Sequence, residues 1–301
     1  MDNEFNTMKI LATTGQGLFE ERTWTCPDPQ PNEIRVRSLL TGVCRSDIDM
    51  MLGDFVLLPE HMMGHEGLGQ VISIGSDIQD VEPGDIVATR GEPAYADEYC
   101  VREREYVEVP ECDPRYIIEP VACGINCVSQ NLSLIESKQG GRLLILGSGF
   151  LAWCAYNYIQ ATGLDFDITV VGKSNRDIWR DVLQPTYTGT YDVVIDLSSG
   201  TDVFDQPILN NQAVVILGSQ KTVTTDFGNL LWKACSIVFP SPRTDNFYSA
   251  MVTAVELIKL GYLNVDKFWT RGYDRQTEWQ EAFKDAVARP ENYSRGYIKW
   301  H

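Results

Sequence analysis

The stretch that most constrains the fold is a run of apolar residues followed at once by two closely spaced glycines. Leu143–Leu146 predicts a short buried strand, and Gly147-Ser148-Gly149-Phe150-Leu151-Ala152 has the form G-x-G-x-x-A ahead of a helical stretch. Gly147 permits a tight turn, Gly149 lets backbone approach a pyrophosphate, and Ala152 allows the helix to pack closely on the strand. The helix N-terminus then faces the phosphates. The stretch therefore predicts a dinucleotide site.

The end of the next strand indicates which dinucleotide binds. An acidic residue normally stands there to hold the adenosine ribose of NAD. Here the strand at 168–171 runs into Gly172-Lys173-Ser174-Asn175-Arg176. Glycine leaves room for a 2′-phosphate, and Lys173, Ser174 and Arg176 offer donors to it. We therefore expect NADP(H), and we expect Gly172→Asp to shift preference toward NAD. The alternative is that the two cations are ordinary loop residues.

Short apolar strands continue beyond this point at 193–195, 213–217 and 237–239, with helical stretches between several of them. This alternation predicts a doubly wound parallel sheet, and the overall class α/β. The region from 177 to 191 is short, so one strand–helix unit is expected to be trimmed. The first 110 residues instead predict strands at 8–11, 33–40, 67–75 and 85–88.

Three separated segments offer metal donors. Cys44 and Ser46-Asp47 lie in Gly42–Asp49, His65 and Glu66 in Gly64-His65-Glu66-Gly67, and Glu119 precedes Pro120. A thiolate, an imidazole and carboxylate oxygens are zinc ligands, and they leave room for water or substrate. Asp47 is the natural acceptor for the free ring N–H of His65. Each residue alone would more often be core or surface. The residues leave open whether Glu66 or Glu119 is the direct ligand.

The residues of these segments, and the order of the segments in the chain, resemble those of the zinc-dependent medium-chain alcohol and polyol dehydrogenases. The resemblance rests on Gly-x-Cys-Arg-Ser-Asp at 42–47, Gly-His-Glu at 64–66, Pro-Gly-Asp-Ile-Val at 83–87 and Glu-Pro-Val-Ala-Cys-Gly-Ile-Asn at 119–126. The last segment resembles the sorbitol dehydrogenase branch. The resemblance implies a GroES-like, mostly-β catalytic domain at 1–129, completed by about 262–301. It implies a Rossmann NADP-binding domain at 130–261.

The resemblance also implies roles. Ser46 would pass the substrate hydroxyl proton inward, and Asp49 stands where many relatives end a proton relay with histidine. Between Ala88 and Ala96 the four-cysteine lobe of many relatives is missing, so one catalytic Zn²⁺ is expected and no second metal. Beyond the fingerprint and the 172–176 loop, the residues implied in cofactor binding are Arg45, Ser198, Leu217, Gly218 and Lys299.

The implied activity is hydride transfer between NADP(H) and a secondary alcohol or ketone, in a polyol, sugar or (amino)cyclitol. A homodimer paired through the cofactor domains is also implied. One alternative is a zinc-free NADPH enone or quinone reductase, and another is a non-catalytic NADPH-binding protein or sensor. A third is redox-neutral chemistry with transient oxidation of the substrate.

Composition excludes some partners. The chain has 301 residues and a net charge of −17, with a pI near 4.5, so it lacks the basic face that nucleic acid requires. The acidic start, Met1-Asp2-Asn3-Glu4, is unlike a signal peptide, and the apolar stretch 143–159 carries glycines unlike a membrane span. A cytoplasmic protein without a membrane partner is expected. Its eight scattered cysteines would be reduced there.

Overall fold

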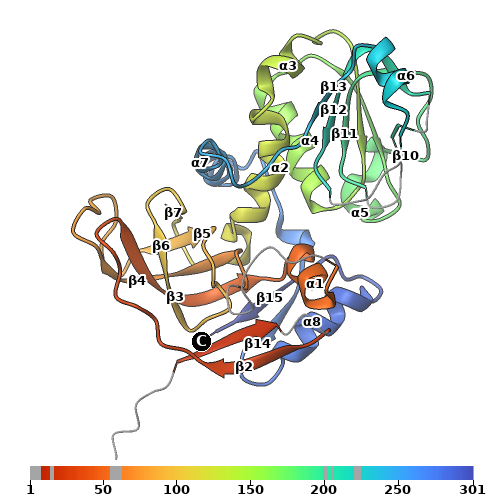
Figure 1. Ribbon diagram of the computed structural model, residues 1–301. Coiled ribbons are helices and arrows are strands. Elements are labelled where there is room, and N and C mark those ends of the chain that lie inside the picture. Colours follow the sequence, from red (N-terminus) through yellow and green to blue (C-terminus); the bar gives the residue numbers. More distant parts are fainter. Residues whose placement is uncertain are drawn as a thin grey trace, which may run out of the picture. The chain divides into compact units, whose positions relative to one another are not determined.

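The chain forms two compact units, each described here by itself (Figure 1). The computed structural model describes residues 8–13, 17–54, 63–198, 203–204, 207–219 and 225–300. Unit 1 is Met1–Glu119 with Asn264–His301, and unit 2 is Pro120–Leu263. The first boundary between the units, at Glu119/Pro120, lies before the boundary expected at 129/130. The second boundary, at Leu263/Asn264, lies two residues after the one expected near 261/262.

Unit 1 is built on a seven-stranded sheet. Its strands are β3 (Glu33–Gly42), β4 (Gly67–Ile74), β5 (Ile86–Thr89), β6 (Glu98–Arg102), β7 (Tyr106–Glu108), β14 (Trp269–Asp274) and β15 (Arg295–Lys299). The main path runs β14-β15-β3-β4-β5-β7, and β6 pairs with β3. Along β3, Ile34 and Val36 are buried while Arg35 and Arg37 are partly exposed, the alternation on which this strand was predicted.

The two ends of the chain build unit 1 together. β15 pairs antiparallel with β3, and β14 pairs parallel with β15. One hydrophobic cluster joins Leu11 and Tyr95 to Phe283 of α8 (Trp279–Ala288) and to Ile298 and Trp300. Because these partners are distant in sequence, this core forms only when the C-terminal segment is in place.

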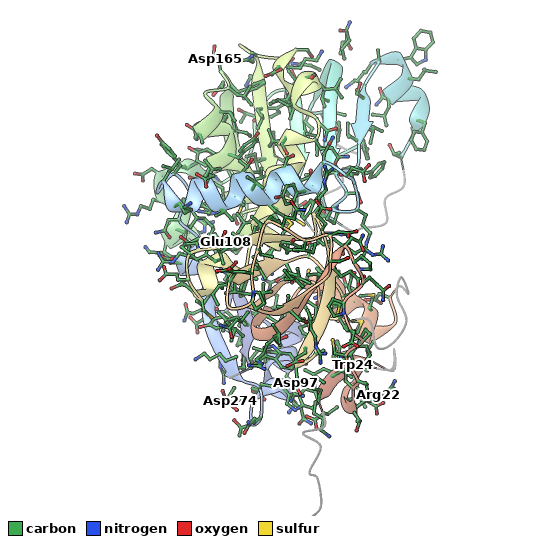
Figure 2. All side chains as sticks on the ribbon, turned by 90° about the vertical axis from the view of Figure 1, so that its left-hand side faces the viewer. Arg22, Trp24, Asp97, Glu108, Asp165 and Asp274 are labelled. Carbon is green, nitrogen blue, oxygen red and sulfur yellow. The ribbon has the colours of Figure 1, made fainter. Side chains whose placement is uncertain are left out.

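A two-stranded sheet of β1 (Lys9–Thr13) and β2 (Phe19–Thr23) leads into a connection that lies against β6. The indole Nε1 of Trp24 donates to the Glu98 carbonyl at 2.9 Å, and the Lys9 backbone N–H donates to Asp97 at 2.6 Å. Figure 2 labels Trp24 and Asp97, which mark the two segments. The first bond holds the connection before β3 against β6, and the second holds β1 against the residue that precedes β6.

Unit 2 is built on a parallel sheet with the strand order β10-β9-β8-β11-β12-β13 (Figure 1). The strands are β8 (Arg142–Leu146), β9 (Asp167–Val171), β10 (Leu183–Gln184), β11 (Tyr191–Asp196), β12 (Leu209–Leu217) and β13 (Ser236–Val238). The helices are α2 (Glu119–Ser129), which starts at the last residue of unit 1, α3 (Leu132–Glu136), α4 (Phe150–Thr162), α5 (Arg176–Trp179), α6 (Phe227–Trp232) and α7 (Phe247–Lys259).

Apolar side chains cover both faces of this sheet. Leu143 and Ile145 of β8 belong to a cluster with Ile159 of α4, whereas Leu144 belongs to a second cluster with Leu230 of α6. Alternate residues of a strand point to opposite faces, so the sheet is buried on both sides. The predicted Rossmann-type sheet and the GroES-like unit are confirmed. The trimmed region is α5, of four residues, a short 3₁₀ turn and β10, of two residues.

Within the described residues, no helix is both long enough and apolar enough to cross a membrane.

Candidate functional site

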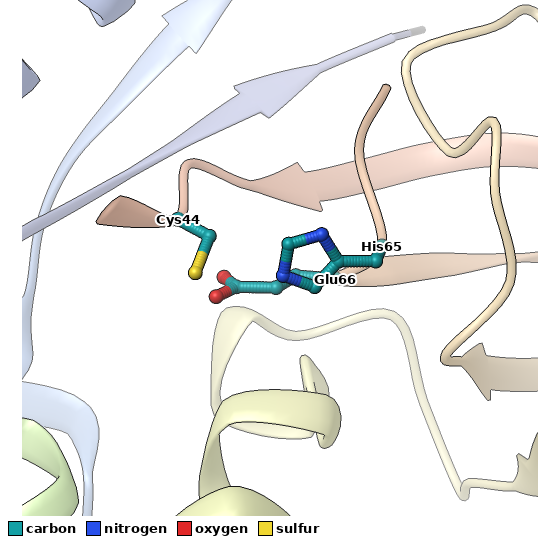
Figure 3. Close-up of side chains that lie close together, drawn as sticks. All are labelled: Cys44, His65 and Glu66. Atoms are coloured by element: carbon teal, nitrogen blue, oxygen red, sulfur yellow. The ribbon is translucent and has the colours of Figure 1, made fainter. Parts of the chain in front are cut away.

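Pairing of β3 with β4 brings three candidate ligands together. Cys44 lies two residues after β3 and is the N-cap of α1 (Arg45–Leu52), whereas His65 and Glu66 directly precede β4. Thr41 stands opposite Gly67 in the antiparallel register, so the two segments leave the sheet side by side. One ligand atom from each of the three side chains lies within 4.8 Å of the others. Figure 3 shows the three side chains converging.

Asp47 fixes the orientation of the imidazole. Its buried carboxylate lies 3.4 Å from His65 Nδ1 through Oδ1, and Oδ2 accepts a 2.8 Å hydrogen bond from the Tyr95 hydroxyl. The Gly64 backbone N–H also donates to Oδ1, at 3.4 Å. With Nδ1 held by a carboxylate, Nε2 is the ring nitrogen available to a metal.

Ser46 stands between two of the candidate ligands. Its hydroxyl donates to Cys44 Sγ at 3.2 Å and lies 3.5 Å from His65 Nε2. A hydroxyl in this place reaches the same small volume as the donors. It is positioned to exchange a proton with a group bound beside them.

Arg295 of β15 compensates the buried carboxylate of Glu66. Its guanidinium pairs with both oxygens of Glu66, whose side chain has no exposed surface. Burial would lower the pKa of Arg295, but the charges of Glu66, Cys44 and Glu119, together with the hydrogen bond to Glu66, outweigh burial and raise it. Arg295 could not be found from the sequence, because no local pattern ties a residue in the last strand to one 229 positions earlier.

Charges within the cluster also shift the other two donors. Burial, with the charge of Glu66, raises the pKa of the Cys44 thiol. Burial would lower the pKa of His65, but the charges of Asp47 and Cys44 raise it well above its usual value.

Glu119 lies outside the three-donor group. It is buried at the first turn of α2, and its charge is among those that raise the pKa of Arg295. Arg295 thus faces both candidate carboxylates. The group itself includes Glu66 and not Glu119.

Arg45 and Asp49 pair with each other on α1, with 2.6 Å between Nε and Oδ1. Arg45 was expected to contact a pyrophosphate and Asp49 to end a proton relay. As described, Asp49 is engaged by a cation, while the Arg45 side chain remains 56% exposed. His61, one of the three histidines of the chain, lies outside the described residues.

The glycine-rich turn of unit 2 has the geometry its sequence predicted. Gly147 has φ of +115°, and a Cβ there would lie 3.0 Å from the Leu197 carbonyl oxygen. Gly149 is the N-cap of α4, and a Cβ there would meet no atom within 4 Å. The N-terminus of α4 is therefore open to an approaching group, whereas the side chain of Phe150 is buried.

Ser148, the variable residue of the turn, joins it to the loop after β9. Its hydroxyl accepts from the Ser174 N–H at 3.0 Å and lies 3.1 Å from Ser174 Oγ. Its carbonyl accepts from Asn175 Nδ2 at 2.8 Å. Lys173 on this loop and Arg176, the first residue of α5, are both exposed.

Gly172 has a packing reason for being glycine. A Cβ at this position would lie 2.7 Å from the Ser148 backbone nitrogen and would also collide with its side chain. The sequence suggested only that a glycine at position 172 leaves room for a 2′-phosphate. A Gly172→Asp exchange would displace Ser148, so it cannot test cofactor preference cleanly.

The remaining expected cofactor residues of unit 2 follow β11 and β12. Ser198 donates to Asp196 Oδ1 through its N–H at 3.0 Å and its hydroxyl at 2.8 Å. Gly218 follows Leu217, the last residue of β12, and donates its N–H to the Asp196 carbonyl at 3.0 Å. These residues share the carboxyl edge of the sheet with the glycine-rich turn, where nucleotides bind in such folds. Lys299 lies in unit 1, on β15.

Comparison with known proteins gives a consistent family. Residues 30–130 match the model of the alcohol dehydrogenase GroES-like domain. L-threonine 3-dehydrogenase of Pyrococcus horikoshii is 24% identical over 86% of this chain and 89% of its own length. Sorbitol dehydrogenase of Ovis aries is 35% identical, but over only 30% of this chain and 27% of its own length. The chain thus spans about a quarter of that relative in the alignment.

Among solved structures, 2R,3R-butanediol dehydrogenase of Bacillus subtilis has the same fold. It superposes with a TM-score of 0.77 at 17% identity, covering 98% of this chain and all of that one. Together these matches support the medium-chain dehydrogenase superfamily as the family that this chain resembles.

The donor atoms of this site can be compared with the ligands that zinc prefers. Cys44 and His65 offer sulfur and nitrogen, a buried carboxylate adds oxygen, and Asp47 fixes the nitrogen that faces the group. This set matches the ligand preferences of zinc and the orientation of zinc-bound histidine. The residues present therefore fit the metal.

Proposed function

We propose that this protein is a zinc-dependent oxidoreductase that transfers a hydride between NADP(H) and a secondary alcohol or its ketone. The observation that carries the proposal is the convergence of Cys44, His65 and Glu66, with Asp47 behind the imidazole and the Ser46 hydroxyl beside it. Relatives named sorbitol and L-threonine dehydrogenase support a polyol, sugar or (amino)cyclitol substrate.

Cys44 and His65 would hold the zinc, with Glu66 or Glu119 as the carboxylate donor. When bound, the metal would supply Lewis acidity to the substrate oxygen. Ser46 would relay the hydroxyl proton: in oxidation it accepts the substrate proton while its own hydroxyl proton passes on to water, and in reduction the transfer runs in reverse. Asp47 keeps the His65 ring in place, and Arg295 neutralises whichever carboxylate is not engaged.

Two exposed cations support NADP(H) as the cofactor. Lys173 and Arg176 flank the loop that Ser148 fixes beside the glycine-rich turn. A 2′-phosphate carries up to two negative charges, which such cations bind through charge-assisted hydrogen bonds. Ser174 contributes less than the sequence suggested, because its hydroxyl already contacts Ser148.

The cofactor assignment is tested by replacing both cations. The double variant Lys173→Ala/Arg176→Ala is expected to weaken NADPH binding by about 100-fold or more, since each charged hydrogen bond contributes about 1.5–3 kcal/mol and two are lost. NADH binding should change little. Lys259→Ala is the matched control, because Lys259 is a cation of unit 2 that pairs with Glu256 on α7. Equal losses for NADPH and NADH would overturn the assignment.

The reaction itself is tested with sorbitol, L-threonine, 2,3-butanediol and inositols, and with the matching ketones. Zinc-loaded protein is expected to oxidise at least one alcohol with NADP⁺ and to lose that activity with a chelator. Ser46→Ala should keep zinc and NADPH binding while kcat falls about 10²-fold or more. Reduction of enones by metal-free protein would instead identify the zinc-free reductase.

The homodimer implied by the resemblance also stays a proposal, as does the cytoplasmic location. Support for a dimer through unit 2 comes from the exposed apolar side chains of α6 and of the residue after β13: Phe227, Leu231, Trp232 and Phe239. Patches of this kind mark interaction surfaces. Light scattering after gel filtration would give the mass directly, and a monomer would contradict it.

A further inference from the structure

Two cysteines outside the proposed metal and cofactor sites lie in contact. Cys26 is in the connection between β2 and β3, and Cys100 is on β6. Their sulfur atoms are 3.9 Å apart. Both thiols also reach the Pro27 carbonyl, at 3.5 Å from Cys26 and 3.3 Å from Cys100. The two chain segments are already held together here by the Trp24–Glu98 hydrogen bond.

The two thiols differ in access. Cys26 is 6% exposed, whereas Cys100 is half-buried and open to small reagents. Arg35 lies opposite Cys100 in the β3–β6 register and pairs with Glu98 at 2.7 Å. A hydrogen bond from Cys26, aided by the charge of Arg35, lowers the pKa of Cys100 against the effect of burial. The same contact raises the pKa of Cys26.

We propose that Cys26 and Cys100 form a reversible disulfide, with Cys100 as the attacking thiol and Cys26 as the resolving thiol. The oxidant is a low-molecular-weight disulfide such as oxidised glutathione. A disulfide bond is about 2 Å long, so the two sulfurs would have to approach by about 2 Å from their present contact. The two cysteines lie outside the proposed hydride-transfer site. The disulfide proposal therefore does not depend on the proposed function.

The exchange balances without any further reactant. The Cys100 thiolate attacks one sulfur of oxidised glutathione, whose S–S bond breaks and releases one glutathione thiolate. Cys26 then loses its proton and attacks the Cys100 sulfur, and the second glutathione leaves as a thiolate. Two cysteine thiols are oxidised, one glutathione disulfide is reduced, and the two protons pass to the released glutathiones.

Closing this bond would link two positions that enclose Cys44, His65 and Glu66 in sequence. A long closed loop restricts the unfolded chain more than a short one. The oxidised protein is therefore expected to melt at a higher temperature than the reduced protein, at equal zinc content.

The test uses full-length, zinc-loaded protein equilibrated in buffers of increasing oxidised-to-reduced glutathione ratio. Samples are quenched in acid, alkylated, digested and mapped by mass spectrometry. We expect a cross-linked Cys26–Cys100 peptide that accumulates with the ratio and disappears with dithiothreitol. Two results would overturn the proposal. In the first, Cys26 and Cys100 both remain free thiols and are alkylated at a glutathione ratio at which the exposed Cys112 already carries glutathione. In the second, the wild-type chain accumulates glutathione on Cys100 and forms no cross-link.

Three variants separate the two roles. Cys26→Ser should accumulate glutathione on Cys100, because no thiol resolves the mixed disulfide. Cys100→Ser should leave Cys26 unmodified, because Cys26 is buried. The control Cys112→Ser should form the cross-link as the wild type does. If the buried substitution prevents folding, the wild-type peptide map alone still decides.

Discussion

Asp47 has no exposed surface, yet both oxygens of its carboxylate have partners. One faces His65 Nδ1, and the other accepts from the Tyr95 hydroxyl. A buried carboxylate is costly unless it is paired and hydrogen-bonded. Here the charge of the imidazole and a tyrosine hydroxyl offset that cost. Asp47 therefore determines which ring nitrogen faces the metal.

Replacing Asp47 should weaken zinc binding without removing a ligand. Asp47→Asn is expected to reduce zinc affinity by about 10–100-fold, because the ring loses the carboxylate that orients it. Competition against a chromophoric chelator measures the change. Tyr95→Phe is the matched control, because it removes one hydrogen bond from Asp47 and keeps the charge, so its loss should be smaller. An affinity for Asp47→Asn within twofold of wild type would contradict this role.

At this scale the sequence predicted residues that share a short segment and missed those that meet across the fold. Cys44 and Asp47 stand in one motif, and His65 and Glu66 stand in another. Arg295 reaches Glu66 only because β15 pairs with β3, a pairing that no local pattern encodes. Gly172 was interpreted from the acidic residue that it replaces. The close approach of Ser148 to this position could not be predicted, because it depends on how two loops meet.

Among the elements, the segment that enters β4 carries a glycine with two constraints. Gly64 has φ of +81°, and a Cβ there would lie 2.6 Å from Tyr95 Cγ and 2.7 Å from the Tyr95 nitrogen. Left-handed backbone disfavours a side chain. The Tyr95 nitrogen cannot move aside without disturbing its 3.1 Å hydrogen bond to the Met63 carbonyl. The position of His65 therefore depends on Gly64.

Alanine substitutions separate these two constraints. Gly64→Ala is expected to lower the free energy of unfolding by about 2–5 kcal/mol, from backbone strain plus overpacking. Gly84→Ala is the control, since Gly84 has φ of +110° but no atom within 4 Å of a Cβ. Its expected loss is about 1–2 kcal/mol, from strain alone. Urea unfolding measures both, and equal losses would show that the contact with Tyr95 does not matter.

Elements were predictable where their residues repeat with one period. β3, β8 and α4 follow clear apolar patterns and stand close to the predicted ranges. β2 was missed because most of its Phe19–Thr23 sequence is polar and faces solvent. β14 was missed because its pairing with β15, rather than its own sequence, makes it a strand.

For the molecule as a whole, unit 2 is continuous in sequence whereas unit 1 needs both ends of the chain. The segment after Leu263 supplies β14, α8, β15 and Arg295 to unit 1. Sequence alone located the two units through the positions of their motifs. It did not place the first break, because α2 is one continuous helix whose first residue belongs to unit 1.

Truncation after Leu263 is therefore expected to affect the two units unequally. Unit 1 would lose the strand that covers β3 and the cation that balances Glu66, so zinc should no longer bind. Unit 2 should still bind NADPH, which quenching of protein fluorescence would show. A truncated chain that keeps one zinc would contradict the division, and so would one that loses NADPH binding while its parallel sheet remains folded by circular dichroism.

A catalytic zinc held by Cys44 and His65 is tested most directly by measuring the metal content per chain. Protein purified without added zinc should contain about one zinc per chain by mass spectrometry of the metal. Cys44→Ser should lose it, while the exposed Cys112→Ser should keep it. Wild-type protein that binds NADPH but contains no metal would contradict the account and favour the zinc-free reductase or the sensor. Two zinc ions per chain would show that a second site had been missed.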